Sequence, residues 1–391
     1  MSTSPYRLLG AAVSYYTAKI HAFLIHKRVP WIEVLATRAV FKEEILPRVG
    51  WPVIPVLIAP DGTTLQDTSD MVDYLEARHP TPCLVPRTPV RRFASLLFEL
   101  YADEWIKMPA LHYRWNYDHE FAVMEFGRNN DPDRTPAEQR RTGEKIARQF
   151  SGWLAPLGIT PATIPAIEAE YLGLLVDLER HFAALPFLLG DSPSLADCAL
   201  YGPLHAHLCR DPNSGFILRR HAPRVVTWLE RMTETTAGEC DGHDELPNTL
   251  LPVLQRLSRD YVPVLLTQTA AFQTWLATHN EDIPRLFGMQ AFVVGRGTSF
   301  AATGTRACFS YDQWMLQRAL QVYADSTAES KARIRRTAAT FGAAALLDLD
   351  LQYRVARQHF QLVRAPNSVT SRLPPDGRHS KPSPNSKGRL S

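Results

Sequence analysis

The sequence predicts a small α/β domain at the amino terminus, an all-α domain after it, and an additional, mainly helical extension. The first observation is that residues 5–80 alternate short strand-like and helix-like patterns, in the order β-α-β-α-β-β-α. The second is that nearly every periodic segment of residues 90–240 has helical spacing. The third is the chain length of 391 residues, which leaves a substantial segment beyond these two domains.

The first domain can be followed element by element. "YRLLGAAV" predicts a strand, and residues 17–27 predict a helix that ends before Pro30. "WIEVLA" predicts a second strand, and "VIPVLIAPDGTTLQD" predicts two more on either side of the turn residues "PDG". "TSDMVDYLEARHP" begins with residues typical of a helix N-cap and stops at Pro80. These elements define the predicted domain of residues 5–80.

Composition shifts divide the rest of the chain. The proline-rich residues 81–89 predict a linker to the all-α domain of residues 90–240. Residues 241–330 predict a long helix, two short strands and another helix, a pattern that indicates no particular fold or role. The Ala- and Arg-rich residues 331–364 predict a helix. Residues 365–391, rich in Ser, Pro, Lys and Arg, predict a disordered basic tail.

The totals exclude some classes of protein. A hydrophobic content of 45% and a charged content of 21% are typical of a globular protein with a sizeable core. The net charge is +3, but residues 365–391 hold five basic residues against one aspartate, so the remaining chain is close to neutral. A nucleic-acid-binding body would be basic throughout, so no nucleic-acid partner is expected.

Cysteine use and hydropathy indicate a soluble, cytoplasmic protein. The five cysteines are scattered and form no CxxC pair, which favours a reduced setting. No apolar run reaches the ~18 residues of a membrane span, and the first residues lack the pattern of a signal peptide. His205, His207 and Cys209 suggest metal ligands, but on a helix only His205 and Cys209 share a face, so neither a membrane span nor a metal is expected.

The junction of the first strand and helix carries two hydroxyl residues, Ser14 and Thr17. Either could cap the helix, a contact worth ~1 kcal/mol. Either could instead hold the reactive atom of a ligand over the positive end of the helix. The residues alone leave both roles open.

Four motifs, in this order and spacing, resemble the glutathione transferase superfamily over roughly residues 5–235. "SYYTAK" resembles the strand-to-helix corner of the serine-type members, and "VIPVL" resembles the cis-proline segment of thioredoxin-like folds. "LQDTSDMVDYLEARHP" is similar to the family's glutamate-serine motif, and "PFLLGDSPSLADCALYGPLHAHL" to the capping-box helix of its α-domain. The chain is thus similar to serine-type, cytosolic members with a C-terminal extension, and the first domain is expected to be thioredoxin-like.

The resemblance implies that Ser14 stabilises the thiolate of glutathione, the co-substrate. A free thiol with a pKa of ~8.5 is only slightly ionised at pH 7. A hydroxyl donor and a helix N-terminus both favour the charged form. Tyr15 and Tyr16 are the competing donors, although the family's tyrosine position falls on Val13 in the register that Lys19 sets.

The resemblance also implies a peptide-binding edge. A cis bond between Ile54 and Pro55 would turn the backbone of Ile54 toward an extended peptide. Thr68 would bind the γ-glutamyl carboxylate with the N–H groups at the helix start, and Asp67 would face the α-amino group. Asp67 stands where the family has a glutamate, and its side chain is shorter by one methylene, so it reaches less far toward the peptide. The alternative is that Asp67 and Thr68 only cap the helix.

Two further sets of residues are singled out by their spacing. Trp105, Met108, His112 and Tyr113 follow the start of the all-α domain, where the family places the pocket for the electrophile. An aromatic stripe at helical spacing is also typical of a core, and both readings stay open. Ser194 and Asp197 have the S-x-x-D spacing of a capping box and are predicted to be structural.

The sequence therefore indicates a glutathione transferase that conjugates the glutathione thiolate to a small electrophile. The alternative is a non-catalytic, transferase-like adaptor that binds a protein partner through its extension, since a fold does not by itself establish a function. Two-domain members usually pair through both domains. A homodimer is thus expected unless the extension covers that face.

Overall fold

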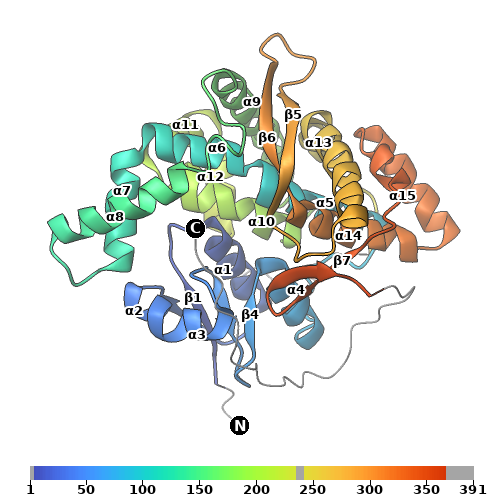
Figure 1. Cartoon of the computed structure of the whole chain (residues 1–391). Coiled ribbons are helices and arrows are strands. Elements are labelled where there is room, and N and C mark those ends of the chain that lie inside the picture. Colours follow the sequence, from blue (N-terminus) through green and yellow to red (C-terminus); the bar gives the residue numbers. More distant parts are fainter. Residues whose placement is uncertain (1–3, 235–241, 367–391) are drawn as a thin grey trace.

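The computed structural model describes residues 4–234 and 242–366. All but the first two residues of the predicted tail, 365–391, lie outside this range, so the expectation of disorder there is not tested. Figure 1 shows the amino-terminal domain below the helical domain, with the extension along one side of both.

The amino-terminal domain is built on one mixed sheet with the strand order β2-β1-β3-β4. β1 runs parallel to β2 and antiparallel to β3, which in turn is antiparallel to β4. Helices cover this sheet, and α1 makes the crossover that a parallel pair requires. The predicted thioredoxin-like α/β domain is confirmed. Its elements are β1 (Tyr6–Gly10), α1 (Tyr15–Lys27), β2 (Trp31–Leu35), α2 (Arg38–Val40), η1 (Phe41–Ile45), α3 (Leu46–Val49), β3 (Val56–Ile58), β4 (Thr64–Gln66) and α4 (Thr68–Arg78).

The second domain is helical throughout, as predicted. Several of its helices begin with proline in the first turn, where the missing N–H breaks no hydrogen bond. Short π-helical turns, η2 to η4, interrupt the long helices. Its elements are α5 (Pro89–Leu100), η2 (Tyr101–Trp105), α6 (Lys107–His112), η3 (Tyr113–Tyr117), α7 (His119–Asn130), α8 (Pro136–Ser151), α9 (Ile164–Ala184), α10 (Leu195–Pro203), η4 (Leu204–Cys209), α11 (Pro212–His221) and α12 (Pro223–Arg231).

The start of α10 is held by Asp197. Its Oδ2 accepts hydrogen bonds from the backbone N and the Oγ of Ser194, at 2.9 and 2.8 Å. Its Oδ1 accepts from the backbone N of Leu188 and from Nε1 of Trp228. These contacts join the helix start to the preceding loop and to α12, which is the structural role expected of this pair.

The extension consists of helices and two β-hairpins. The long helix and the first hairpin follow the pattern that the sequence predicts for residues 241–330. The elements are η5 (Asn248–Leu250), α13 (Leu251–Thr278), β5 (Leu286–Val294), β6 (Ala302–Phe309), α14 (Ser310–Asp325), α15 (Ala328–Thr340), η6 (Ala344–Asp348), β7 (Val355–Gln358) and β8 (Gln361–Arg364).

The single helix predicted for residues 331–364 is wrong in its second half. α15 ends at Thr340, and Gly342 follows with φ +85, a conformation that a helix cannot continue through. β7 and β8 then form an antiparallel hairpin. Its two turn residues, His359 and Phe360, both have positive φ, as a tight hairpin turn requires.

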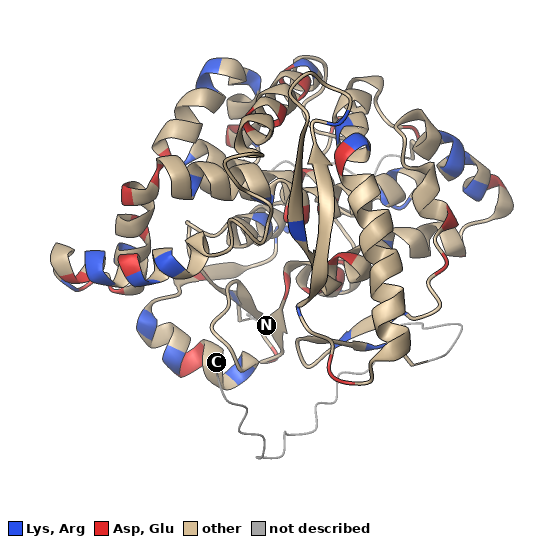
Figure 2. Ribbon diagram, turned by 45° about the horizontal axis from the view of Figure 1, so that its top comes forward, with Lys and Arg blue, Asp and Glu red and all other residues tan. Residues whose placement is uncertain are grey.

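Cys198, Cys209 and Cys308 are free thiols, whereas Cys83 is disulfide-bonded. The expectation that all cysteines are reduced is therefore wrong for Cys83. Among the described residues, no helix has the length and apolarity to cross a membrane. In the view of Figure 2, acidic and basic residues alternate along the outer helices.

A buried carboxylate joins the three parts of the chain. Glu99 of α5 is fully buried, and its Oε1 accepts from Lys19 Nζ of α1 at 2.7 Å and from Ser69 Oγ of α4 at 2.8 Å. Its Oε2 accepts from Arg318 Nη1 of α14 at 2.5 Å. Lys19 also binds Asp103, at 2.6 Å. The two domains and the extension thus meet at one ionic cluster, the Glu99 cluster, formed by these five residues.

Opposite charges keep Glu99 and Lys19 ionised. Burial alone would raise the pKa of Glu99, but Arg318 and Lys19 lower it to about 2. Burial would likewise lower the pKa of Lys19, and the charges of Asp103 and Glu99 instead raise it above its ordinary value. Glu99 and Lys19 are therefore charged at neutral pH, whereas burial raises the pKa of Asp103 to about 7.

We expect Glu99→Gln to lower the free energy of unfolding by about 3–5 kcal/mol, because it leaves Lys19 and Arg318 short of a buried counter-charge. Urea unfolding followed by circular dichroism measures this change. Glu120→Gln is the control, because Glu120 pairs with Arg140 on the exposed surface and its loss should change stability far less than the loss of Glu99. A loss equal to that of the control would contradict a central role for Glu99.

The cluster also predicts a pH dependence. The pKa of Glu99 is lower in the folded chain than in the unfolded chain. Its contribution to stability is therefore fully present above its unfolded pKa of ~4.3 and is lost as the pH falls toward 2. Between these limits the wild type should lose more stability than Glu99→Gln. If the free energies of unfolding of the wild type and of Glu99→Gln fell in parallel as the pH is lowered, Glu99 would not titrate as described.

Candidate functional site

The register of the sheet brings three of the predicted site residues to one edge. Leu9 at the end of β1 pairs with Val56 at the start of β3, and Val56 pairs with Gln66 at the end of β4. Ser14 follows β1, Ile54 precedes β3, and Asp67 follows β4. The candidate site is this edge of the sheet, which the helix starts of α1 and α4 flank (Figure 1).

Ser14 is the N-cap of α1. Its backbone is extended, with φ −97 and ψ 118, and its Oγ accepts a hydrogen bond from the backbone N of Thr17 at 3.2 Å. The contact uses a lone pair of the hydroxyl, so the O–H remains available to donate to another group. The half-buried Ser14 can thus cap the helix and donate to a ligand at the same time.

The two neighbouring tyrosines are engaged elsewhere. The hydroxyls of Tyr15 and Tyr16 both donate to the backbone O of Asp103, at 3.0 and 3.2 Å. Burial raises the pKa of both phenols well above 10. Their hydroxyls point to the helical domain. Of the two hydroxyls left at this corner, Thr17 is 2% exposed and Ser14 is half-buried, so Ser14 is the one more open to a ligand.

The peptide bond between Ile54 and Pro55 is cis, as the resemblance implies. Pro55 is buried and Ile54 half-buried. Within residues 4–234 and 242–366, the backbone N–H and C=O of Ile54 form no hydrogen bond. This short segment therefore offers an unpaired edge of the kind that an extended peptide can join.

Asp67 has φ +86, a conformation that is strained for a residue with a side chain. Its Oδ1 accepts from the backbone N of Ser69 at 2.9 Å, so it caps α4. Its Oδ2 accepts from the hydroxyl of Tyr311, on α14, at 2.5 Å. Thr68 is 3% exposed. The side chain of Asp67 is thus already held by the chain on both oxygens.

A second residue of the extension lies at the start of α4. Nε of Arg357, on β7, donates to Asp70 Oδ2 at 2.7 Å, and its Nη2 donates to Gln66 Oε1 at 2.9 Å. Its Nη1 lies 4.0 Å from Asp67 Oδ2. Burial and the charge of Asp67 raise the pKa of Asp70 to about 7, which Arg357 partly offsets. Arg357 therefore places a positive charge of the chain itself beside the carboxylates of Asp67 and Asp70.

The turn of the same hairpin reaches the cis-proline segment. Phe360 packs edge-on against Trp51, with ring centroids 6.5 Å apart, and joins the apolar cluster that includes Ile54. Figure 1 shows this hairpin, labelled at β7, lying across α4. The sequence analysis missed Tyr311, Arg357 and Phe360. The alternation in "VARQHFQLVR" is the one signal that could have indicated a hairpin.

The residues proposed for an electrophile pocket separate into two groups. Trp105 and Met108 line a cavity of about 30 Å³ between the second domain and the extension, which holds about two water molecules. His112 instead bonds Glu168 at 2.9 Å, and Tyr113 packs on other tyrosines. The cavity is lined by Tyr101, Trp105, Ile106, Met108, Pro109, Ile167, Glu170, Tyr171, Leu174, Arg256 and Val294.

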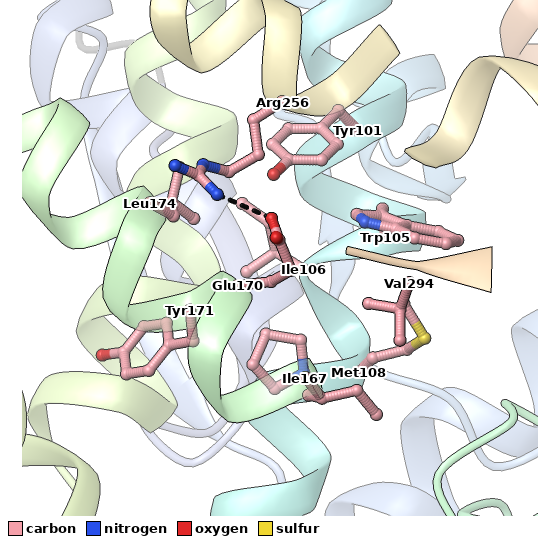
Figure 3. Close-up of a pocket in the computed structure, with 11 residues that line it drawn as sticks. Tyr101, Trp105, Ile106, Met108, Ile167, Glu170, Tyr171, Leu174, Arg256 and Val294 are labelled. Carbon is pink, nitrogen blue, oxygen red and sulfur yellow. Dashed lines mark hydrogen bonds and ion pairs between the residues drawn. The ribbon is translucent and has the colours of Figure 1, made fainter. Parts of the chain in front are cut away.

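This cavity is charged as well as aromatic. Figure 3 shows Arg256 of α13 reaching toward Glu170 of α9, and their closest atoms are 2.6 Å apart. Oε1 of Glu170 is buried and has no hydrogen-bond partner among the residues that the structure describes. In its present form the cavity is too small for an organic substrate. Among the described residues, no group of three or more His, Cys, Asp or Glu side chains is placed to hold a metal ion.

Comparison with protein families agrees with this fold. Residues 8–83 match the model "Glutathione S-transferase, N-terminal domain", and residues 161–231 match "Glutathione S-transferase, C-terminal domain". The chain is therefore a member of the glutathione S-transferase superfamily, with an additional region beyond residue 231. No curated protein sequence matches it significantly.

Several solved structures resemble parts of this chain at low sequence identity. A glutathione S-transferase from Rhodospirillum rubrum is 17% identical, with 64% of this chain and 91% of that chain covered and a TM-score of 0.37. The β-etherase LigF from Sphingobium is 18% identical over 60% and 97% of the two chains, with a TM-score of 0.44. A glutathione S-transferase from Methylobacillus flagellatus, solved with glutathione bound, is 19% identical over 59% and 96%, with a TM-score of 0.38.

Proposed function

We propose that this protein is a glutathione-dependent transferase that conjugates the glutathione thiolate to a small electrophile. The observation that carries the proposal is the position of Ser14. Its hydroxyl stands at the N-terminus of α1 with its donor free, on the sheet edge where Ile54 is unpaired. The family membership of both domains supports the same function.

In the proposed reaction, the Ser14 hydroxyl and the end of α1 stabilise the thiolate, which raises its population at neutral pH. The sulfur lone pair forms a C–S bond with the electrophile. In a substitution the leaving group departs with its bonding pair, and in an addition the resulting carbanion takes a proton from water. Holding both reactants together supplies the remaining rate enhancement.

In this proposal, the backbone of Ile54, next to cis Pro55, pairs with the cysteinyl residue of glutathione, and Thr68 with the helix start binds the γ-glutamyl carboxylate. Asp67 faces the α-amino group. Trp105 and Met108 are proposed for the electrophile side of the site, whereas the contacts of His112 and Tyr113 favour a packing role. The homodimer and the cytoplasmic location remain expectations from the sequence.

One observation favours the second candidate, a transferase-like adaptor that binds a protein partner. Tyr311 and Arg357 of the extension engage Asp67 and Gln66, the acceptors nearest to the proposed α-amino position. Because side chains of the extension already satisfy these acceptors, no bound ligand is required to satisfy them. Glutathione binding therefore distinguishes the two candidates.

The first test is calorimetric titration of wild type and Ser14→Ala with glutathione, with the pH titration of the bound thiolate read by ultraviolet absorbance. We expect the wild type to bind with a thiol pKa below its free value of ~8.5–9, and Ser14→Ala to raise that pKa by about one unit or more. Thr135→Ala is the control, because it removes an N-cap from α8, in the second domain. No binding at millimolar glutathione would reject the transferase and favour the adaptor.

A second prediction concerns Asp67. Removing the hydroxyl in Tyr311→Phe frees Oδ2 of Asp67. Without Tyr311 as donor, Oδ2 of Asp67 is a buried acceptor with no partner, which is unfavourable. The α-amino group of glutathione can then donate to it, and this added hydrogen bond should contribute about 1 kcal/mol to binding. Affinity for glutathione should rise about fivefold. Tyr117→Phe, which loses a hydroxyl contact to Glu168, is the calorimetric control. Weaker binding by Tyr311→Phe would mean that Tyr311 itself contacts the ligand.

A further inference from the structure

Arg114 of η3 is a buried arginine, and each of its five N–H groups donates one hydrogen bond. Nε and Nη2 donate to the two carboxylate oxygens of Asp211, at 2.6 and 2.8 Å, and Nη2 also donates to Ala206 O at 2.7 Å. Nη1 donates to His207 Nε2 at 2.6 Å and to Val13 O at 2.7 Å. The guanidinium therefore cannot rotate without breaking several contacts.

Four of these five contacts lie within the second domain. Asp211 precedes α11, and Ala206 and His207 belong to η4. The carboxylate of Asp211 binds two N–H groups side by side, which fixes the plane of the guanidinium. The fifth contact crosses to the first domain, where it reaches the residue immediately before Ser14.

His207 can accept from Arg114 only when its ring is neutral. Burial, followed by the charge of Arg114, lowers the pKa of His207 well below its ordinary value, so the ring is neutral at pH 7. With Nε2 as the acceptor, Nδ1 carries the proton and donates to Ala110 O at 3.4 Å. His207 thus helps to fix the orientation of Nη1 of Arg114.

The peptide group between Val13 and Ser14 is held at both ends. Its C=O accepts from Arg114, and its N–H donates to Ala11 O at 2.9 Å. Because a peptide group is planar, these two contacts fix its orientation. On the other side of Ser14, its own C=O accepts from the backbone N of Ala18 at 3.0 Å. Together these contacts set the direction in which the Ser14 side chain leaves the backbone.

We propose that Arg114 is a positioning residue for the reaction, which aims the Ser14 hydroxyl at the position of the glutathione sulfur. In this proposal Arg114 touches neither the sulfur nor the peptide, and it acts through the peptide group between Val13 and Ser14. Asp211 neutralises the charge of Arg114 at contact distance, so the guanidinium adds little direct attraction for a thiolate. The inference rests on the proposed function, because that function assigns the thiolate to Ser14.

The test compares wild type with Arg114→Met/Asp211→Leu, which replaces the buried ion pair by apolar side chains. Removing both partners together leaves neither charge buried alone, so the chain is expected to fold. The side chain of Asp211 forms no cap hydrogen bond with α11, so this helix keeps its start. The pKa of the bound glutathione thiol, read by ultraviolet absorbance, should rise by about half a unit or more. A thiol pKa equal to that of the wild type would overturn the proposal.

A double-mutant cycle with Ser14→Ala shows whether Arg114 acts through Ser14. In the Ser14→Ala background, Arg114→Met/Asp211→Leu should raise the thiol pKa no further. A full further rise would mean that the guanidinium acts on the thiolate directly, which would overturn the positioning role.

S-methylglutathione separates positioning from general damage to the site, because it has no thiol to ionise. Arg114→Met/Asp211→Leu should bind it within about twofold of the wild-type affinity. A large loss of this affinity would show that the peptide site itself depends on Arg114, and would overturn the proposal.

Arg210→Met/Glu125→Leu is the matched control, since Arg210 and Glu125 form an ion pair within the second domain, next in sequence to Asp211. This control should leave the thiol pKa at its wild-type value. An equal rise in the thiol pKa of the control would overturn the specific role of Arg114.

Amide hydrogen exchange of the free protein gives a readout without glutathione. The N–H of Thr17, which donates to Ser14 Oγ, should exchange faster in Arg114→Met/Asp211→Leu than in the control. Equal exchange in the two variants would overturn the role of Arg114. A wild type that binds no glutathione would instead reject the proposed function, so the two failures are distinguishable.

Discussion

The carboxylate of Glu99 is the contact on which the arrangement of the whole chain depends. It lies in the second domain, yet its oxygens bind α1 and α4 of the first domain and α14 of the extension. A buried carboxylate is stable only if cations and hydrogen-bond donors compensate its lost hydration. Lys19 and Arg318 supply the charges and Ser69 a donor. The extension is therefore an integral part of the fold, because removing α14 would leave the cluster without Arg318.

This anchoring has a consequence for the candidate site. Arg318 fixes α14, and the first turn of the same helix carries Tyr311, whose hydroxyl donates to Asp67. One helix thus contacts both the Glu99 cluster and the edge proposed for glutathione.

Much of the amino-terminal fold could be predicted because its signals are local. Hydrophobic alternation, the turn residues "PDG" and the cap residues around Ser14 and Thr68 each act within a few positions. The hairpin of β7 and β8 carried only the weak alternation of "VARQHFQLVR", since its strands are short and rich in Arg and Gln. Its turn places His359 and Phe360 at positive φ, where glycine or asparagine would usually mark the turn.

By itself, the sequence determined the two-domain framework, the cap at Ser14 and the candidate edge around Pro55 and Asp67, because periodicity and short motifs encode them. Only the tertiary structure decided what surrounds that edge. Tyr311 meets Asp67 across 244 positions of sequence, and Arg114 of the second domain meets Val13 of the first. Burial and electrostatic pairing depend on distances in space between residues that are remote along the chain. No local pattern records them.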